Sequence, residues 1–382
     1  MKKAAILTIT DYVNYGNRLQ NYAAQELLKS LNLDVESIGN IAIPENETEL
    51  PLSERIANAL RLSPATLLNK AIEKIQELKN RDKYKLGQKA KEKSFREYSA
   101  KHMQETDYVI SRNNLPEDLG NRYDYFFVGS DQIWNPNIRY GSPVDFLTFA
   151  PKNKRIALSP SFGVSTISSE FSSRYRQWLS EMKFLSVREQ AGADIIKNLT
   201  GREAPVLVDP TLMLTKEQWL AVSEKGRKKP QKDYLLTYFI GAVSSKRKKI
   251  LNEIANKNGL EIVQLASLDD IEHYDANPGE FIDYINSARL VCTDSFHAII
   301  FSMQMEKPFM VFDREGKSAP MSSRIETLLS KFKFESRKYS KLQHSTEIFQ
   351  IDFSHLPEIL KLERAKVSEY LNKALQTDTT TA

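Results

Sequence analysis

The chain has 382 residues, more than one ordinary hydrophobic core takes up, so two domains of roughly 150–200 residues each are expected. Hydrophobic residues make up 41% and charged residues 27%, as in ordinary globular proteins, and the net charge of +5 comes with so many acids that it does not indicate nucleic-acid binding. One cysteine excludes an internal disulfide, and five scattered histidines give no zinc spacing, so we assign no metal.

The N-terminal segment Met1–Thr10 joins two lysines to an apolar run and superficially resembles a signal peptide. The run is short, Asp11 and Asn14 follow at once, and no small-residue cleavage site appears, so a first buried strand is the better interpretation. No stretch of the sequence is long enough to span a bilayer. We therefore expect a cytoplasmic protein, with peripheral contact at the inner face of the membrane left open.

Short apolar runs alternate with helical segments along most of the chain. Because the runs are continuous, they predict strands covered on both faces, and hence parallel sheets in an α/β fold. The expected strands are Ala4–Thr10, Tyr123–Gly129, Arg155–Ser159, Phe184–Arg188, Val206–Asp209, Tyr234–Ile240, Glu261–Leu265, Leu290–Thr293 and Phe309–Phe312. The expected helices are Leu19–Ser30, Gln190–Leu199, Ser245–Lys257, Glu280–Ala288, Phe296–Met305 and a tail helix at about Leu356–Leu375.

A charged stretch that contains Gly and Pro and lacks periodicity, Lys216–Lys232, indicates a linker between two α/β units. We expect an N-terminal domain at 1–215, the linker at 216–232, a smaller C-terminal domain at 233–345 and a C-terminal helix and tail at 346–382.

A Lys-rich helical insertion at about 52–105 interrupts the first domain. A solvated helix face is the simpler interpretation of its charge. The alternative is a basic surface that contacts an anionic lipid or a polyanionic acceptor.

Polar residues follow two of the expected strands in the first domain, at the sheet edge where α/β folds bind ligands. After the first strand, Gly16 permits unusual backbone conformations and Asn17 can cap the next helix, whose first amides can face an anion. After the second expected strand, Ser130 and Asp131 present a hydroxyl and a carboxylate, and Trp134 offers an aromatic face for a sugar ring. Helix capping and a packed tryptophan are the structural alternatives.

Two arginines lie where they can bind anions. Arg188 ends an expected buried strand, with an internal ion pair to Glu189 or Asp209 as the alternative. Arg324 opens a later helix and can face the same cleft.

The segment Thr293–Ala298 places a histidine at the start of a helix. His297 would lie in the first turn, at the positive end of the helix dipole, beside Asp294 and Ser295. This is a suitable place for an anion together with a proton-transfer group, although a packed histidine is the commoner outcome.

Together these motifs resemble the polysaccharide pyruvyl transferase family, in the same order and over about Ile6–Leu329. The motifs are Gly-Asn-Arg-Leu-Gln-Asn-Tyr from Gly16, Phe-Val-Gly-Ser-Asp-Gln-Ile-Trp-Asn-Pro from Phe127, Ser-Val-Arg-Glu from Ser186, Val-Asp-Pro-Thr-Leu from Val208, Thr-Asp-Ser-Phe-His-Ala from Thr293 and Ser-Arg-Ile-Glu-Thr-Leu-Leu from Ser323.

The resemblance implies two Rossmann-like domains that face each other across a cleft, as in GT-B glycosyltransferases. It implies phosphoenolpyruvate as donor, a saccharide as acceptor, and no metal or cofactor. By motif position, His297 corresponds to the acid/base residue and Arg188 to a contact with the donor anion. Many members carry Arg two residues before that histidine, whereas this chain has Ser295, so the cation must come from Arg188, Arg324 or Arg18.

We therefore expect an enzyme that transfers the enolpyruvyl group of phosphoenolpyruvate to a sugar as a ketal, with polymeric and lipid-linked acceptors both open. The expected catalytic residues are His297, Asp294 and Asp131. The expected substrate-binding residues are Asn17, Arg18, Gln20, Ser130, Trp134, Arg188, Ser295 and Arg324.

Two other functions fit the same pattern. A GT-B glycosyltransferase would need a carboxylate for the ribose of a nucleotide sugar, and Glu326 is the one modest candidate. The second alternative is a non-catalytic family member that binds glycans.

Overall fold

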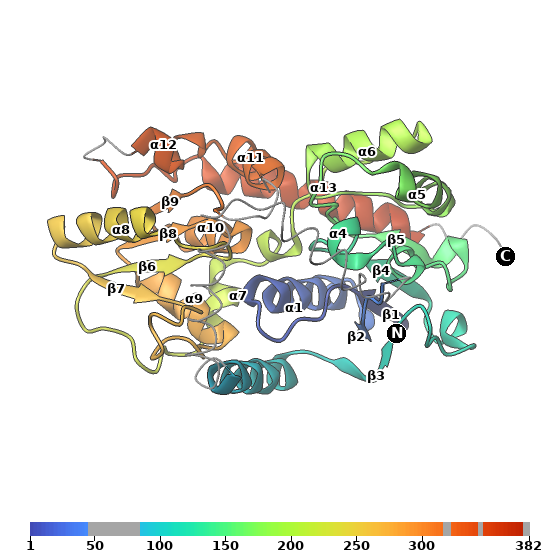
Figure 1. The fold of residues 1–382 in the computed structure, drawn as a ribbon. Helices are drawn as coiled ribbons and strands as arrows, with labels where there is room; N and C mark the ends of the chain where they lie inside the picture. The colour runs from blue at the N-terminus through green and yellow to red at the C-terminus, as the bar shows by residue number, and fades with distance from the viewer. Residues whose placement is uncertain (45–84, 316–321, 343–346, 377–382) are drawn as a thin grey trace, which may run out of the picture.

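The computed structural model describes residues 1–44, 85–315, 322–342 and 347–376. Two parallel sheets lie side by side, each with helices packed against it (Figure 1). The first sheet has the order β3-β2-β1-β4-β5 and the second the order β7-β6-β8-β9. All the strand pairs within both sheets are parallel, which confirms the α/β fold with two Rossmann-like sheets.

The strands are short and mostly buried, as expected for sheets covered on both faces. The first sheet consists of β1 (Lys2–Leu7), β2 (Leu33–Asn40), β3 (Glu105–Ile110), β4 (Tyr125–Val128) and β5 (Arg155–Ala157). The second sheet consists of β6 (Tyr234–Tyr238), β7 (Glu261–Gln264), β8 (Leu290–Thr293) and β9 (Phe309–Val311).

Most helices connect consecutive strands or follow the last one. They are α1 (Tyr15–Lys29), α4 (Pro136–Arg139), α5 (Ser169–Glu181), α6 (Gln190–Thr200), α7 (Lys216–Ala221), α8 (Ser245–Lys257), α9 (Pro278–Ser287), α10 (Phe296–Gln304), α11 (Ser322–Lys331), α12 (Tyr339–Leu342) and α13 (Leu356–Gln376). A further helical segment covers 85–102, and the rest of the expected insertion, from 52 to 84, lies outside the described residues. Among the described helices, none combines the length and the apolar character that crossing a membrane requires.

The strands expected at Phe184–Arg188 and Val206–Asp209 are wrong as regular strands. Single parallel bridges join Phe184 to Ile156 and Val187 to Val206, so these segments extend the first sheet beyond β5 without forming a continuous ladder. Here the Ser186 hydroxyl takes part in place of backbone groups. It accepts a hydrogen bond from the amide of Ser159 at 2.9 Å and donates to the carbonyl of Ala157 at 2.6 Å.

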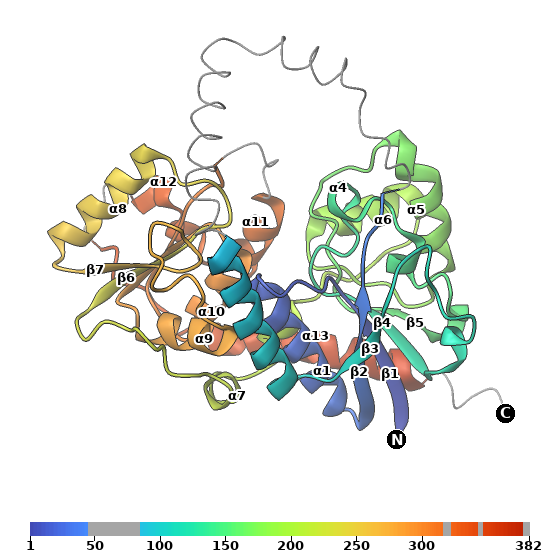
Figure 2. The ribbon, with the colours of Figure 1, turned by 60° about the horizontal axis from the view of Figure 1, so that its bottom comes forward.

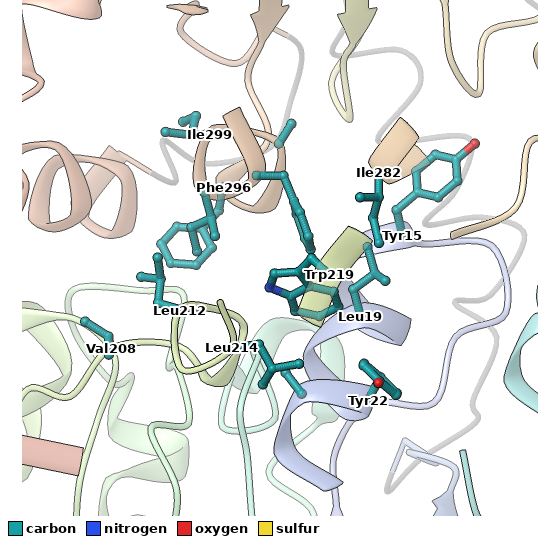
Figure 3. Packing of buried hydrophobic residues seen from close by; sticks show 14 of the residues in the cluster. Tyr15, Leu19, Tyr22, Val208, Leu212, Leu214, Trp219, Ile282, Phe296 and Ile299 are labelled. Atoms are coloured by element: carbon teal, nitrogen blue, oxygen red, sulfur yellow. The ribbon is translucent and has the colours of Figure 1, made fainter. Parts of the chain in front are cut away.

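A hydrophobic cluster fills the space between the two sheets and includes Trp219 of α7, within the segment expected to be a linker. The Trp219 ring lies 5.7 Å from the ring of Tyr22 on α1 and 4.9 Å from that of Phe301 on α10, centroid to centroid. Figure 3 shows Trp219 with Leu19 and Tyr22 on one side and Phe296 on the other. Burial of such large rings ties the two sheets into one packed unit.

Two helices also bridge the sheets (Figure 2). On the segment 85–102, the Ser94 hydroxyl donates to the carbonyl of Asp275, 2.8 Å away, near the second sheet. Helix α13 leaves the second sheet and reaches the first, where the Tyr370 hydroxyl donates to the carbonyl of Ala157 at 2.7 Å. The polar ends of β1, β4 and β8 therefore meet along one fixed seam.

Candidate active site

A buried group of polar side chains lies on this seam, and we call it the ionic cluster. Its residues come from α1, from the turn after β4 and from the start of α10. Two more lie next to the bridge at Val187 and directly before Pro210. Its members are Asn17, Ser130, Asp131, Arg188, Asp209 and His297.

His297 opens α10, whose N-cap residue Ser295 accepts a hydrogen bond from the backbone amide of Ala298 at 3.4 Å. The imidazole is 7% exposed. Its Nδ1 edge packs against Gly16 of α1 so closely that a Cβ at position 16 would lie 2.0 Å from Nδ1. Its Nε2 lies 3.7 Å from Oδ2 of Asp209 and has no hydrogen-bond partner among the described residues.

Asp209 is held by four donors. Its Oδ1 accepts hydrogen bonds from the amide and the hydroxyl of Thr211, at 3.0 and 2.7 Å. Its Oδ2 accepts from the Ser130 hydroxyl and from Nη1 of Arg188, both at 2.7 Å. Burial alone would raise the pKa of this carboxyl, but His297, Arg188 and Ser130 outweigh it and hold the pKa well below its ordinary value. Asp209 is therefore a carboxylate that can stabilise a protonated imidazole.

Arg188 connects the two carboxylates of the ionic cluster. It is 4% exposed, and its Nη2 lies 3.5 Å from Oδ1 of Asp131. The other oxygen of Asp131 accepts a hydrogen bond from the Asn17 amide at 3.3 Å. Burial raises the pKa of the Asp131 carboxyl, but the positive charge of Arg188 and its neighbours outweighs this and lowers the pKa overall.

Arg324 of α11 adds a second buried guanidinium and is 6% exposed. The ring of Phe296 lies 4.4 Å from the guanidinium carbon of Arg188 and 6.0 Å from that of Arg324, measured to the ring centroid. Both arginines line a small pocket together with Phe296 and Lys331. Burial and the nearby charge of Arg188 lower the pKa of Arg324 to about 10. Two guanidinium groups thus lie on either side of one pocket around Phe296, the residue before His297, an arrangement suited to an anionic ligand.

The family model for polysaccharide pyruvyl transferases matches residues 14–316. The chain belongs to this family. The match confirms the resemblance of the sequence motifs and includes all the residues of the ionic cluster.

A search of curated proteins gave no significant match. Solved structures similar in overall course include a UDP-GlcNAc 2-epimerase from Neisseria meningitidis bound to UDP-GlcNAc, at 10% identity and a TM-score of 0.45, with 98% of this chain and 100% of that chain covered. The glycosyltransferase SnogD from Streptomyces nogalater is also similar, at 11% identity and a TM-score of 0.42, with 99% of both chains covered. Values this low carry no argument about chemistry.

In this chain of the pyruvyl transferase family, the side chain of Asp294 is bonded to backbone groups of its own domain. Its two carboxylate oxygens accept hydrogen bonds from the amides of Ile240 and Gly241, at 2.7 and 3.1 Å, and Arg314 lies 3.5 Å from one of them. The side chain is 1% exposed. Both oxygens of Asp294 thus accept from backbone amides of the loop after β6, so the structure shows this carboxylate fixing that loop.

Trp134 is also held within the fold. Its ring is fully buried, lies parallel to the ring of Phe146 at 5.3 Å between centroids, and donates from Nε1 to the carbonyl of Asp145 at 2.9 Å. A large ring with its polar edge satisfied inside the core leaves no face for a sugar.

Arg18 and Gln20 of α1 also contact residues of the fold. Arg18 is fully buried and its Nη1 lies 2.6 Å from Oε1 of Glu105 on β3, whereas its Nε and Nη2 have no hydrogen-bond partner among the described residues. The side-chain oxygen Oε1 of Gln20 accepts a hydrogen bond from the backbone amide of Ser130 at 3.0 Å and thereby positions a residue of the ionic cluster.

Sequence reasoning missed two features of the site. Asp209 was expected only as an internal partner of Arg188, although its place in the Val-Asp-Pro-Thr-Leu motif was a usable signal. The contact of Gly16 with His297 joins residues of the two sheets and leaves no local pattern in the sequence. No cluster of metal-ligating side chains is found in the described ranges.

Proposed function

We propose that this chain transfers the enolpyruvyl group of phosphoenolpyruvate to two hydroxyls of one sugar and forms a cyclic ketal. The observation that carries the proposal is the contact of the His297 imidazole with the Asp209 carboxylate, next to Arg188, in a chain of the pyruvyl transferase family. An acid, its orienting carboxylate and a cationic group are what this reaction needs.

The reaction balances as follows. A proton passes from the acid to the methylene carbon of phosphoenolpyruvate, and a first sugar hydroxyl adds to the neighbouring carbon and returns its proton to the conjugate base of that acid. The bond from that carbon to the phosphate oxygen then breaks, and inorganic phosphate leaves. A second hydroxyl of the same sugar adds in its place, and its proton is taken up by the phosphate.

His297 is proposed as the residue that delivers the first proton. Its Nε2 lies 3.7 Å from Oδ2 of Asp209, a carboxylate whose lowered pKa keeps it charged, and this carboxylate can orient the ring. Asp131 faces Arg188 and Asn17 within the ionic cluster and is therefore proposed as the acid that orients an acceptor hydroxyl. Arg188 and Arg324 would bind the phosphate and the carboxylate of the donor.

Substrate access is part of the proposal, because His297 is 7% exposed. We infer that a local opening at the seam admits substrate and that its closure excludes water during transfer. A saccharide acceptor is proposed from the family and not from a particular residue, and the proposal includes both polymeric and lipid-linked saccharides.

The test compares ligands and then products. Thermal unfolding is measured with phosphoenolpyruvate and, separately, with UDP-sugars, and phosphate release is then followed with phosphoenolpyruvate and a panel of glycans. We expect stabilisation by phosphoenolpyruvate and acceptor-dependent phosphate release. Stabilisation by nucleotide sugars alone would favour a glycosyltransferase, and no phosphate release with any glycan would favour a non-catalytic glycan-binding protein.

A further inference from the structure

Lys91 is a cation in an unusual environment on the helical segment 85–102, which bridges the two sheets. It is 5% exposed and is the only buried lysine in the part of the chain that the structure describes. Its ammonium lies 4.9, 5.4 and 5.6 Å from the ring centroids of Tyr15, Phe95 and Tyr274. The ring faces attract the cation but bring no full negative charge.

Among the described residues, the charge of Lys91 is only partly compensated by an acid. Within the described ranges the Lys91 ammonium forms no hydrogen bond and no ion pair within 4.0 Å. Burial lowers the pKa of Lys91 to about 8, and Asp11 is the acid that opposes this effect from a greater distance. The Lys91 side chain is thus largely buried, and its ammonium keeps donors that are available to a ligand.

Lys91 also borders the ionic cluster. Asp11 is the acid whose charge acts on Lys91, and its backbone amide donates to the side-chain oxygen Oδ1 of Asn17 at 2.9 Å. Asn17 in turn donates to Asp131. Tyr15, which lies under the Lys91 ammonium, directly precedes Gly16, the residue packed against His297.

The ionic cluster lacks positive charge for the proposed donor. The two guanidinium groups of Arg188 and Arg324 are offset by the carboxylates of Asp131 and Asp209. A phosphate carries about −1.5 to −2 charge at pH 7, and the donor adds a carboxylate. A further cation at the edge of the cluster would strengthen the binding of a donor that carries two anionic groups.

We propose that Lys91 binds an anionic group of the donor, its carboxylate or its phosphate, when substrate occupies the seam. This inference rests on the proposed function. It assigns a binding role to a residue of the Lys-rich insertion, whose charge the sequence had associated with solvent or with an anionic surface.

The test uses Lys91→Met, Lys91→Arg and, as matched control, Lys89→Met, which removes the same charge from an exposed position on the same helix. In steady-state kinetics, Lys91→Met is expected to raise the KM for phosphoenolpyruvate about tenfold or more with a smaller effect on kcat. Lys91→Arg is expected to restore part of the affinity. Lys89→Met is expected to match the wild type.

Stability separates binding from a structural role. Methionine fills a similar volume among the three rings without a buried charge, so Lys91→Met should unfold at the same or a higher temperature than the wild type. If Lys91→Met unfolds at a lower temperature and keeps the wild-type KM, the lysine serves the fold and the inference is overturned.

Binding to single anions keeps the test independent of turnover. Thermal shifts with inorganic phosphate and with pyruvate are measured for all four proteins, and Lys91→Met should lose the response to one of them selectively, which identifies the group. Equal responses in Lys91→Met and Lys89→Met, or no response of the wild type to either anion, would overturn the inference. Failure of the wild type to respond to phosphoenolpyruvate, with a Lys91-dependent response to phosphate, would instead overturn the proposed function alone.

Discussion

Two buried arginine–aspartate pairs in the first domain differ in how completely they are bonded. Arg139 binds Asp145 through Nε and Nη2, at 2.9 and 2.7 Å, and Asn40 donates a further hydrogen bond to the same carboxylate. Arg188 gives Asp209 one hydrogen bond, and its Nε and Nη2 have no hydrogen-bond partner in the described ranges. The first pair is complete within the fold, whereas the second retains donors for a ligand.

The pKa values of the two carboxyl groups are shifted in opposite directions. Burial raises the pKa of the Asp145 carboxyl despite Arg139. The pKa of Asp209 is lowered, because His297, Arg188 and Ser130 together outweigh burial. A fully bonded buried pair fixes the backbone, whereas a partly bonded one at a seam between domains is costly unless a ligand completes it. Each prediction below tests this distinction.

Replacement of His297 should have the largest effect. We expect His297→Ala to lower pyruvyl transfer by about 10²–10⁴-fold, because the proton donor is lost, with the fold retained. The matched control is His273→Ala: His273 is also buried and lies 2.7 Å from an aspartate, Asp270, but it is not part of the ionic cluster. Phosphate release and thermal unfolding are measured for both, and near-normal transfer by His297→Ala would refute its role.

The two arginines should separate activity from stability. Arg188→Met is expected to lower activity by about 10²–10³-fold, since a donor to the substrate anion is lost, while Asp209 keeps Ser130 and Thr211 as partners. Arg139→Met leaves Asp145 buried with one donor and should cost about 3–5 kcal/mol of unfolding free energy at unchanged activity per folded molecule. Urea unfolding and phosphate release check both, and a loss of activity in folded Arg139→Met would contradict the distinction.

Gly16→Ala probes the contact between the sheets. Alanine favours a helix by about 1 kcal/mol over glycine, but here its Cβ would lie 2.0 Å from Nδ1 of His297 and must displace the ring. We expect activity to fall about 10–10²-fold with little change in stability. In a double-mutant cycle, Gly16→Ala should have no further effect in the His297→Ala background. Additive losses would show that Gly16 acts elsewhere.

Local patterns predicted the parts of the fold that are locally determined. The bounds of α8 and β8 agree with the expected Ser245–Lys257 and Leu290–Thr293, since an apolar periodicity and a continuous apolar run are local signals. Strands β2 and β3 were missed because charged residues interrupt their sequences and much of β3 is solvent-accessible. Their pairing depends on neighbours distant in sequence.

The same limit applies to the site. Asp131, Arg188 and His297, which the motifs place at the ends of expected strands, lie near one seam, and within each sheet the carboxyl ends of parallel strands share an edge. The direction of each side chain was not predictable from local pattern. Asp294, three residues before His297, faces loop amides of its own domain, and Trp134 faces the core, since packing across the molecule decides both.

The smallest expected effect concerns acid stability and has opposite signs for the two aspartates. The folded pKa of Asp209 is lowered, so its contribution to stability is present above its unfolded pKa, about 3.9, and is lost as pH falls through the folded value. The folded pKa of Asp145 is raised, so its contribution is present at low pH and is lost as pH rises through the folded value.

Asp209→Asn should therefore flatten the loss of stability toward acid, and Asp145→Asn should steepen the rise of stability above about pH 4, each by at most about 1.4 kcal/mol per pH unit. Urea unfolding between about pH 3 and 6 at fixed ionic strength measures both slopes. A change of the same sign in both variants would show that the two buried pairs do not differ in the way their hydrogen bonds indicate.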